Sequence, residues 1–194
     1  MVYIDDEIGT MDLQAALSQL TEQRREQAMR FKHEQGRRES AAAFLLLWRA
    51  LRDEYGLEEP PVLAYDDGGK PFLAGHPEIH FNMSHCRVAV ACVVDRRPVG
   101  IDVETIRKYN PQLAAYTMND EELRRIEASA EPEVEFTRLW TMKEALLKMS
   151  GTGLRQNLKT VLTGMEDMET WLRREKGYVC TVCRSRELPY GNDR

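Results

Sequence analysis

A chain of 194 residues, 42% of them hydrophobic, can bury one full-sized core or two smaller cores packed together. Charged residues make up 30% of the chain and the formal net charge is −5, which is typical of a soluble globular protein and argues against a general nucleic-acid binder. The acidic start lacks the apolar core of a targeting segment, and the longest apolar run, Ala41 to Trp48, is too short to cross a bilayer. We therefore expect neither nucleic acid nor a membrane as a partner.

The first half of the chain predicts helices followed by strands. Apolar residues recur every three or four positions between 34 and 55, which predicts a long helix that Gly56 can end. A helix is also expected over about 12–31, with Thr21 as a possible second N-cap. Beyond Pro60 and Pro61, short apolar runs flank the turn residues 66–69. The expected strands are 2–4, 62–65, 70–73, 79–82 and 88–94.

The second half repeats this order. A strand is expected over 99–104, and helices follow Pro111, one of them starting at the N-cap Asn119 and its acidic first turn. A long helix over 133–149 can be closed by Gly151 and Gly153. We expect strands over 158–163 and 177–184 and an unstructured tail over 188–194. The doubled order predicts an α+β protein with two similar lobes, 1–98 and 99–194.

Two of the four cysteines, Cys180 and Cys183, have the C-x-x-C spacing of a metal site. They lie in a predicted strand, where positions three apart point to opposite faces, and no second pair completes a zinc set. We interpret them as structural thiols. Reduced thiols in a chain without a visible signal segment predict a cytoplasmic protein.

Residues 99–104 carry the first candidate site. Their alternation places Asp102 and Glu104 on one face of the strand, opposite the apolar positions. Two neighbouring carboxylates repel each other unless a cation lies between them. The segment by itself allows either a solvated acidic face or a cation site.

Residues 140–148 form a second candidate. Trp140, Glu144 and Lys148 are spaced four apart, so they share one face of the predicted helix. Glu144 and Lys148 can form an exposed ion pair worth a few tenths of a kcal/mol, or they can serve a site. Trp140 can be a core anchor.

Three further segments have ordinary and functional interpretations. Gly69-Lys70-Pro71 suits a hairpin turn, and Asn82-Met83-Ser84-His85 suits a capped turn. Basic residues concentrated between 24 and 38 can form a solvated helix face or bind phosphates or an acidic protein.

The order of these segments resembles the 4′-phosphopantetheinyl transferase superfamily, whose pattern is G-[IV]-D, a spacer, and then [FW]-x-x-K-E-[AS]-x-x-K. The matching segments are Gly100-Ile-Asp102 and Trp140-Thr-Met-Lys-Glu-Ala-Leu-Leu-Lys148. Gly69-Lys-Pro71 and Phe81-Asn-Met-Ser-His85 lie upstream, as in the two-lobed surfactin-synthetase-activating (Sfp-like) branch. The resemblance covers about residues 24 to 153 and implies a pseudo-twofold α+β monomer, each lobe a small antiparallel sheet with helices.

The resemblance also implies roles for individual residues. The C-terminal lobe would hold Mg²⁺ through Asp102, Glu104 and Glu144, with Glu144 and Lys148 catalytic. The N-terminal lobe would contribute to coenzyme A binding. The residues expected to bind the coenzyme are Arg24, Ser40, Lys70, Ser84, His85, Lys143 and Lys148. This chain departs from the family at Gln27 and Glu39, where cations are common, although Arg37 or Arg38 can substitute for the second. Cys86 replaces the serine usual after Ser-His.

The implied activity is that of a holo-[acyl-carrier-protein] synthase, which moves 4′-phosphopantetheine from coenzyme A to a carrier serine and releases 3′,5′-ADP. Acyl- and peptidyl-carrier proteins of fatty-acid, polyketide and nonribosomal peptide biosynthesis all remain possible partners. Two alternatives stay open. Asp102, Glu104 and a distant Glu and Lys superficially fit a Mg²⁺-dependent nuclease, and the fold can also serve a non-catalytic carrier-binding protein.

Overall fold

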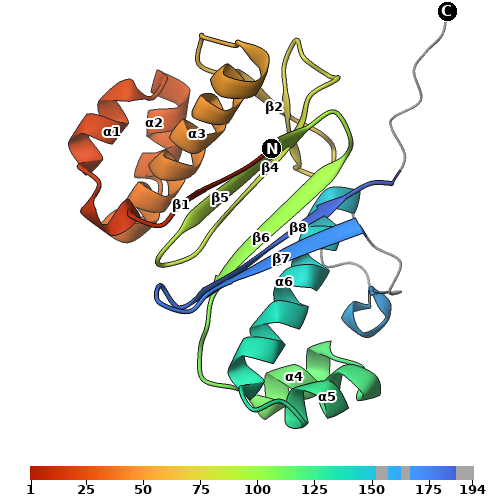
Figure 1. The fold of residues 1–194 in the computed structure, drawn as a ribbon. Helices are drawn as coiled ribbons and strands as arrows, with labels where there is room; N and C mark the ends of the chain where they lie inside the picture. The colour runs from red at the N-terminus through yellow and green to blue at the C-terminus, as the bar shows by residue number, and fades with distance from the viewer. Residues whose placement is uncertain (152–156, 163–166, 187–194) are drawn as a thin grey trace, which may run out of the picture.

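A computed structural model describes residues 1–151, 157–162 and 167–186 (Figure 1). Within these ranges the chain is mixed helix and sheet. No helix there combines the length and apolar character needed to cross a membrane. The predicted tail 188–194, the strand end at 163 and the helix-closing Gly153 lie outside the described residues.

The first half builds a three-stranded antiparallel sheet in the order β1-β5-β4, with the long helix α3 packed on one face (Figure 1). Thr21 caps α2 through its side chain, so the expected helix over 12–31 is two helices that meet at this residue. Gly56 ends α3 in the left-handed conformation, as predicted. The elements are β1 Val2–Asp5, η1 Ile8–Thr10, α1 Leu13–Gln19, α2 Glu22–Met29, α3 Glu34–Tyr55, β2 Leu63–Tyr65, β3 Pro71–Leu73, β4 His80–His85 and β5 Val90–Asp95.

The second half builds another three-stranded antiparallel sheet, in the order β6-β8-β7, with the long helix α6 on one face. Asn119 and Glu122 form a capping box at the start of α5, and Gly151 ends α6 at φ +70°. The elements are β6 Val99–Thr105, α4 Pro111–Thr117, α5 Asp120–Glu127, α6 Pro132–Ser150, η3 Leu158–Thr160, β7 Asp167–Arg173 and β8 Tyr178–Arg184.

Each half therefore combines a small antiparallel sheet with a long helix, which is the α+β arrangement that the sequence predicted. The division of tasks between 1–98 and 99–194 stays a prediction. One predicted strand was wrong, because its described part forms η3, where the Asn157 side chain caps a 3-10 turn. Strand β7 was missed. Its charged and polar residues pair with β8 along an edge, so they lack the apolar signal of a buried strand.

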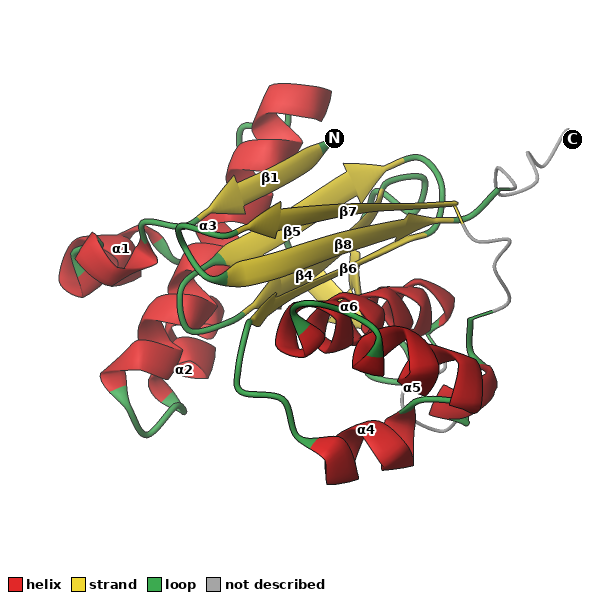
Figure 2. Ribbon diagram, turned by 60° about the horizontal axis from the view of Figure 1, so that its bottom comes forward, coloured by secondary structure: helices red, strands yellow, loops and turns green. Residues whose placement is uncertain are grey.

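Side chains that alternate between the two faces of β5 and β6 pack the two halves of the molecule together. Val90, Cys92 and Val94 pack in one apolar cluster with α3, whereas Ala91 and Val93 pack in another with residues of β6 and β8. The second cluster includes Val99, Ile101, Val103, Tyr178, Cys180 and Val182. Figures 1 and 2 show β6 running beside β4 and β5. The even positions of β6 lie opposite this apolar cluster, as the sequence pattern predicted, and they face α6.

Gly100 is what lets α6 lie so close to β6. A Cβ atom at this position would lie 2.0 Å from the Ala145 carbonyl oxygen and 2.4 Å from the Met149 nitrogen. Both are backbone atoms of α6, so a flexible side chain cannot swing away to relieve the contact. The glycine of the Gly-Ile-Asp segment thus has a packing function, and it brings the polar face of β6 under the helix.

Candidate active site

Three predicted site residues from three elements form a hydrogen-bonded cluster. Lys148 of α6 donates to Asp102 Oδ1 of β6 at 2.6 Å and to Ser84 Oγ of β4 at 2.9 Å. Ser84 in turn donates to the same Asp102 oxygen at 2.9 Å. Ser84 and Asp102 are buried, so these charge-assisted contacts act in surroundings of low dielectric constant. The cluster joins the two halves of the molecule.

Side chains of β4 also fix the backbone of β6. Asn82 Oδ1 accepts from the Ile101 N–H at 2.9 Å, and Ser84 Oγ accepts from the Val103 N–H at 3.3 Å. Asp102 lies between these two anchored peptide groups. The contact by Asn82 was not predicted from the sequence, although the residue belongs to the Phe81–His85 segment.

Glu104 and Glu144 flank this cluster with excess negative charge. Burial raises the pKa of Glu104, and the charges of Asp102 and Glu144 raise it further, against opposing effects of Arg107 and Lys148. Burial likewise raises the pKa of Glu144, with a second contribution from Asp102 and an opposing one from Lys148. Three carboxylates thus act on one another electrostatically, as expected where a cation would bind.

The second oxygen of Asp102 bears on whether a cation would fit this cluster. Asp102 Oδ2 is buried and has no hydrogen-bond partner among the described residues. Within these residues no three carboxylate, imidazole or thiol groups are gathered closely enough to hold a metal ion as they stand. Lys148 supplies the counter-charge for Asp102 instead. An unpaired carboxylate oxygen beside two further carboxylates is an all-oxygen donor set, which fits Mg²⁺ better than a softer metal.

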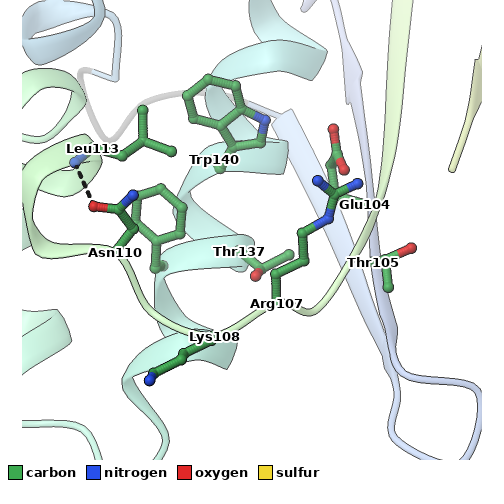
Figure 3. Close-up of a pocket in the computed structure, with 9 residues that line it drawn as sticks. Glu104, Thr105, Arg107, Lys108, Asn110, Leu113, Thr137 and Trp140 are labelled. Atoms are coloured by element: carbon green, nitrogen blue, oxygen red, sulfur yellow. Dashed lines mark hydrogen bonds between the residues drawn. The ribbon is translucent and has the colours of Figure 1, made fainter. Parts of the chain in front are cut away.

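A hollow of about 340 Å³ opens beside Glu104, at the C-terminal end of β6 (Figure 3). Figure 3 shows the Arg107 guanidinium beside the Glu104 carboxylate, with Trp140 and Leu113 on the opposite wall. Trp140 stacks on Phe136 with 6.2 Å between ring centroids. Trp140 is therefore both a packing residue and part of the lining. The mixed charged and aromatic wall leads from the carboxylates toward α4.

Arg24 and Ser40 meet in the first half, away from the carboxylate cluster. The Arg24 guanidinium donates to Gln27 Oε1 and to the Ser40 carbonyl oxygen, and lies 4.8 Å from the centre of the Phe44 ring. Its Nε atom is buried without a partner among the described residues. Burial lowers the pKa of Arg24. A buried cation with an unused donor suits an anion, but Gln27 already occupies part of its fork.

His85 lies next to Ser84 along β4, and its imidazole contacts the Glu39 carboxylate. Its Nδ1 is 3.0 Å from Glu39 Oε2. Neither neighbouring arginine substitutes for a cation at position 39. Arg38 donates to Glu34 and to the Gly9 and Met11 carbonyl oxygens. Arg37 donates to the Phe31 carbonyl oxygen at 2.9 Å.

Lys70 lies on the β2–β3 hairpin and reaches the end of α6. Its Nζ donates to the Met149 carbonyl oxygen at 2.8 Å, where a cation also suits the negative end of the helix dipole. Burial lowers its pKa. The turn before it is the predicted one, with Gly69 at φ +81° and its N–H bonded to the Asp66 carbonyl oxygen.

Lys143 requires a correction. We expected it beside the coenzyme phosphates, but its side chain is fully buried and bonded to Glu122 and two backbone carbonyl oxygens. Successive residues on a helix are about 100° apart, so Lys143 points away from the face that Glu144 and Lys148 share. Its partner Glu122 was recognised in the sequence only as an acid near a helix start.

The structure confirms the strand geometry of the cysteine pair. Cys180 belongs to the apolar cluster between the sheets, whereas Cys183 Sγ lies 3.6 Å from Met149 Sδ of α6. The two thiols therefore lie on opposite faces of β8, where they cannot share one metal ion.

Comparison with known proteins agrees with this arrangement. Residues 98–188 match the model of the 4′-phosphopantetheinyl transferase superfamily, and this range includes Asp102, Glu104, Glu144 and Lys148. The transferase Sfp of Bacillus subtilis is 27% identical over 156 residues, which are 79% of this chain and 70% of Sfp. The transferase psf-1 of Bacillus pumilus is 28% identical over 88% of this chain and 75% of its own length. The transferase HetI of a Nostoc species is 31% identical over 72% of this chain and 63% of its own length. Both sequence segments of the pattern therefore meet at one buried cluster, in a chain that is similar over most of its length to 4′-phosphopantetheinyl transferases, Sfp-like enzymes among them.

Proposed function

We propose that this enzyme transfers 4′-phosphopantetheine from coenzyme A to a serine of an acyl- or peptidyl-carrier protein, in a reaction that depends on Mg²⁺. One observation carries the proposal. Asp102, with an unpaired buried oxygen, is paired with Lys148 and acts electrostatically on two further carboxylates, in a chain whose relatives are named for this transfer. A cytoplasmic monomer without nucleic-acid or membrane partners remains part of the proposal.

Asp102, Glu104 and Glu144 are the residues that would hold Mg²⁺. Bound there, the ion would neutralise and orient the pyrophosphate of the coenzyme. Lys148 would then exchange its contact with Asp102 for a pyrophosphate oxygen, because an ammonium can bind phosphate directly whereas a carboxylate cannot.

The proposed chemistry is a single displacement. The carrier serine oxygen bonds to the β-phosphorus of coenzyme A, and the bond from that phosphorus to the bridging oxygen breaks. The phosphodiester product stays on the carrier, and 3′,5′-ADP leaves with the bridging oxygen. Glu144 takes the serine proton, directly or through a water. Lys148 stabilises the charge that develops on the bridging oxygen as this oxygen leaves with the 5′-phosphate of 3′,5′-ADP.

The coenzyme and the carrier would occupy different sides of this cluster. We expect the phosphates and the adenosine of the coenzyme to bind at a set of polar residues from the first half, namely Ser84, His85, Lys70, Arg24 and Ser40. The hollow beside Glu104 leads toward α4, whose Leu113 and Tyr116 side chains are 41% and 78% exposed. Exposed apolar groups on a short helix next to the reacting centre suit a docked protein, so we place the carrier there.

The direct test is incubation with coenzyme A, Mg²⁺ and a panel of apo-carrier proteins, read by intact mass. We expect a carrier to gain the mass of one phosphopantetheine arm only when both coenzyme A and the divalent cation are present. Nicking of DNA or RNA under the same conditions would support the nuclease alternative. Carrier binding without any mass gain would support the non-catalytic one, and either result would contradict the proposal.

Substitutions of Glu144 and Lys148 are predicted to lower the transfer rate in different ways. Lys148→Ala should lower kcat by about a hundredfold, the scale found when one electrostatic stabiliser is lost, with the Mg²⁺ requirement kept. Glu144→Gln should raise the Mg²⁺ concentration needed and also remove the base, so added metal should rescue it only in part. The measurement is transfer rate against Mg²⁺ concentration, with the exposed Glu127→Gln as the control. Full rescue of Glu144→Gln would leave it a metal ligand alone.

A further inference from the structure

Lys143 is a buried lysine outside the proposed chemistry, and it joins three separate segments. Its ammonium donates to Glu122 Oε2 at 2.7 Å, to the Thr117 carbonyl oxygen at 3.1 Å and to the Leu158 carbonyl oxygen at 2.6 Å. The Lys143 side chain has no solvent exposure. All three protons of the ammonium are therefore used within the protein, and none is left for a ligand.

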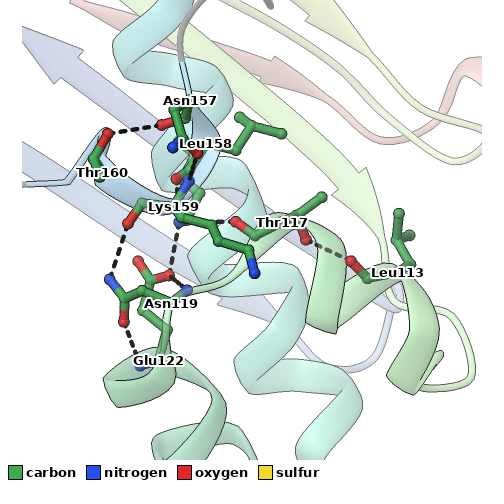
Figure 4. Close-up of polar contacts among 9 residues, drawn as sticks. Leu113, Thr117, Asn119, Glu122, Asn157, Leu158, Lys159 and Thr160 are labelled. Carbon is green, nitrogen blue, oxygen red and sulfur yellow. Dashed lines mark hydrogen bonds and ion pairs between the residues drawn. The ribbon is translucent and has the colours of Figure 1, made fainter.

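The three acceptors come from different parts of the chain. Figure 4 shows Thr117, Glu122 and Leu158 converging from the end of α4, the start of α5 and η3. Glu122 also accepts from the Asn119 N–H at 2.8 Å, and the Asn119 side-chain amide donates to the Lys159 carbonyl oxygen at 3.2 Å. The capping box of α5 is thus part of the same network, and Lys143 ties the whole network to α6.

The tied segments form the surface on which we placed the carrier. A second hollow, of about 600 Å³, is lined by Leu113, Tyr116, Trp140, Asn157 and Lys159 among others. It shares Leu113 and Trp140 with the hollow beside Glu104, so the two are neighbours. Its walls come from α4, α6 and the segment 157–159, and Lys143 bonds to the backbone of the first and the last of these.

We infer that Lys143 is a positioning residue. It holds the surface on which we placed the carrier in a fixed position relative to the face of α6 that carries Glu144 and Lys148, an inference that rests on the proposed function. Lys143 and Glu144 are adjacent on α6, yet one points to the docking segments and the other to the carboxylate cluster. A displacement of α4 and 157–160 would therefore misplace the carrier serine without changing the cluster. Lys143 and Glu122 are both buried and form an ion pair at 2.7 Å, so removal of either partner leaves an isolated buried group.

The test must separate positioning from general stability and from phosphate binding. Lys143→Met keeps the length of the side chain but donates no hydrogen bond. This variant leaves the buried Glu122 carboxylate without its counter-charge. The double variant Lys143→Met/Glu122→Gln is therefore measured beside it, because it removes both charges and keeps the capping box of α5. Glu121→Gln, an exposed neighbour of Glu122, is the control. Each protein is checked by circular dichroism and thermal unfolding, then assayed with coenzyme A and carrier varied separately.

We expect the double variant to unfold near the wild-type temperature and still show a carrier KM raised by about tenfold, since coupling through such networks is of that size. Its kcat and its KM for coenzyme A should stay within about twofold of wild type. Recovery of a normal carrier KM with normal stability would show that Lys143 serves stability alone and would overturn the inference. A raised KM for coenzyme A would show instead that Lys143 contacts the coenzyme, and would also overturn it.

Hydrogen exchange tests the same inference without any transfer reaction. Amides of 113–118 and 157–160 should exchange faster in the double variant than in Glu121→Gln, because the ammonium no longer binds the two backbone carbonyl oxygens. Unchanged exchange would contradict the positioning role even in an active enzyme. Absence of transfer in the wild type would contradict the proposed function, and the exchange result would still decide whether Lys143 ties these segments together.

Discussion

Replacement of Asp102 by asparagine is expected to lower the transfer rate by about a hundredfold or more, the loss seen when a principal electrostatic stabiliser is removed. Asparagine keeps the size of the side chain and one oxygen for the Ser84 and Lys148 contacts. It replaces the unpaired Oδ2 or its equivalent by a group that cannot ligate a cation as a carboxylate does. The measurement is the transfer rate at saturating coenzyme A and carrier, across a range of Mg²⁺ concentrations.

Stability distinguishes this loss from damage to the fold. Asp102→Asn removes one of three mutually repelling carboxylates, of which Asp102 is buried and the other two are half-buried, and it keeps an oxygen for the Lys148 hydrogen bond, so the free energy of unfolding of the metal-free protein should not fall steeply. The exposed residue Asp53 provides the control, Asp53→Asn, which should transfer at the wild-type rate. A folded Asp102→Asn protein with nearly wild-type transfer would assign Asp102 a purely structural role.

Replacement of Gly100 by alanine is expected to cost about 3 kcal/mol or more in free energy of unfolding, the upper part of the range for overpacking. The added methyl group would lie 2.0 Å from the Ala145 carbonyl oxygen, so α6 must move away from β6. For a chain of this size that cost corresponds to a drop of about 6 °C or more in Tm. Transfer should also fall sharply, because the displaced helix carries Glu144 and Lys148 away from Asp102.

Gly9→Ala is the matched control, because a Cβ atom at Gly9 would meet no other atom within 4 Å. Its phi angle is not positive, so alanine introduces no backbone strain there. Thermal unfolding and transfer rate are measured for both variants. If Gly100→Ala unfolds and transfers like Gly9→Ala, then close approach of α6 is not what positions the catalytic residues.

Local sequence signals predicted the individual elements well where residues within or next to an element cap or end it. Thr21 and Asn119 cap helices with their own side chains, and Gly56 and Gly151 end helices in the left-handed conformation. The same holds for β6, whose alternation was readable because one face is wholly apolar. The elements that failed gave only weak local signals, because 158–160 is a short 3-10 turn capped by Asn157 and β7 is an edge strand of charged and polar residues paired only with β8.

The candidate site was predicted unevenly for a similar reason. Period-two and four-residue spacings in the sequence by themselves determined that Asp102 and Glu104 share a strand face and that Glu144 and Lys148 share a helix face. Only the tertiary structure decided that these two faces meet, through Gly100, and that Ser84 joins them from the other half of the chain. It also decided that Lys143, one residue from Glu144, is enclosed by Thr117, Glu122 and Leu158. A repeat pattern defines which side chains share a face, but the partner of that face is selected by packing between segments far apart in the chain, which no local spacing encodes.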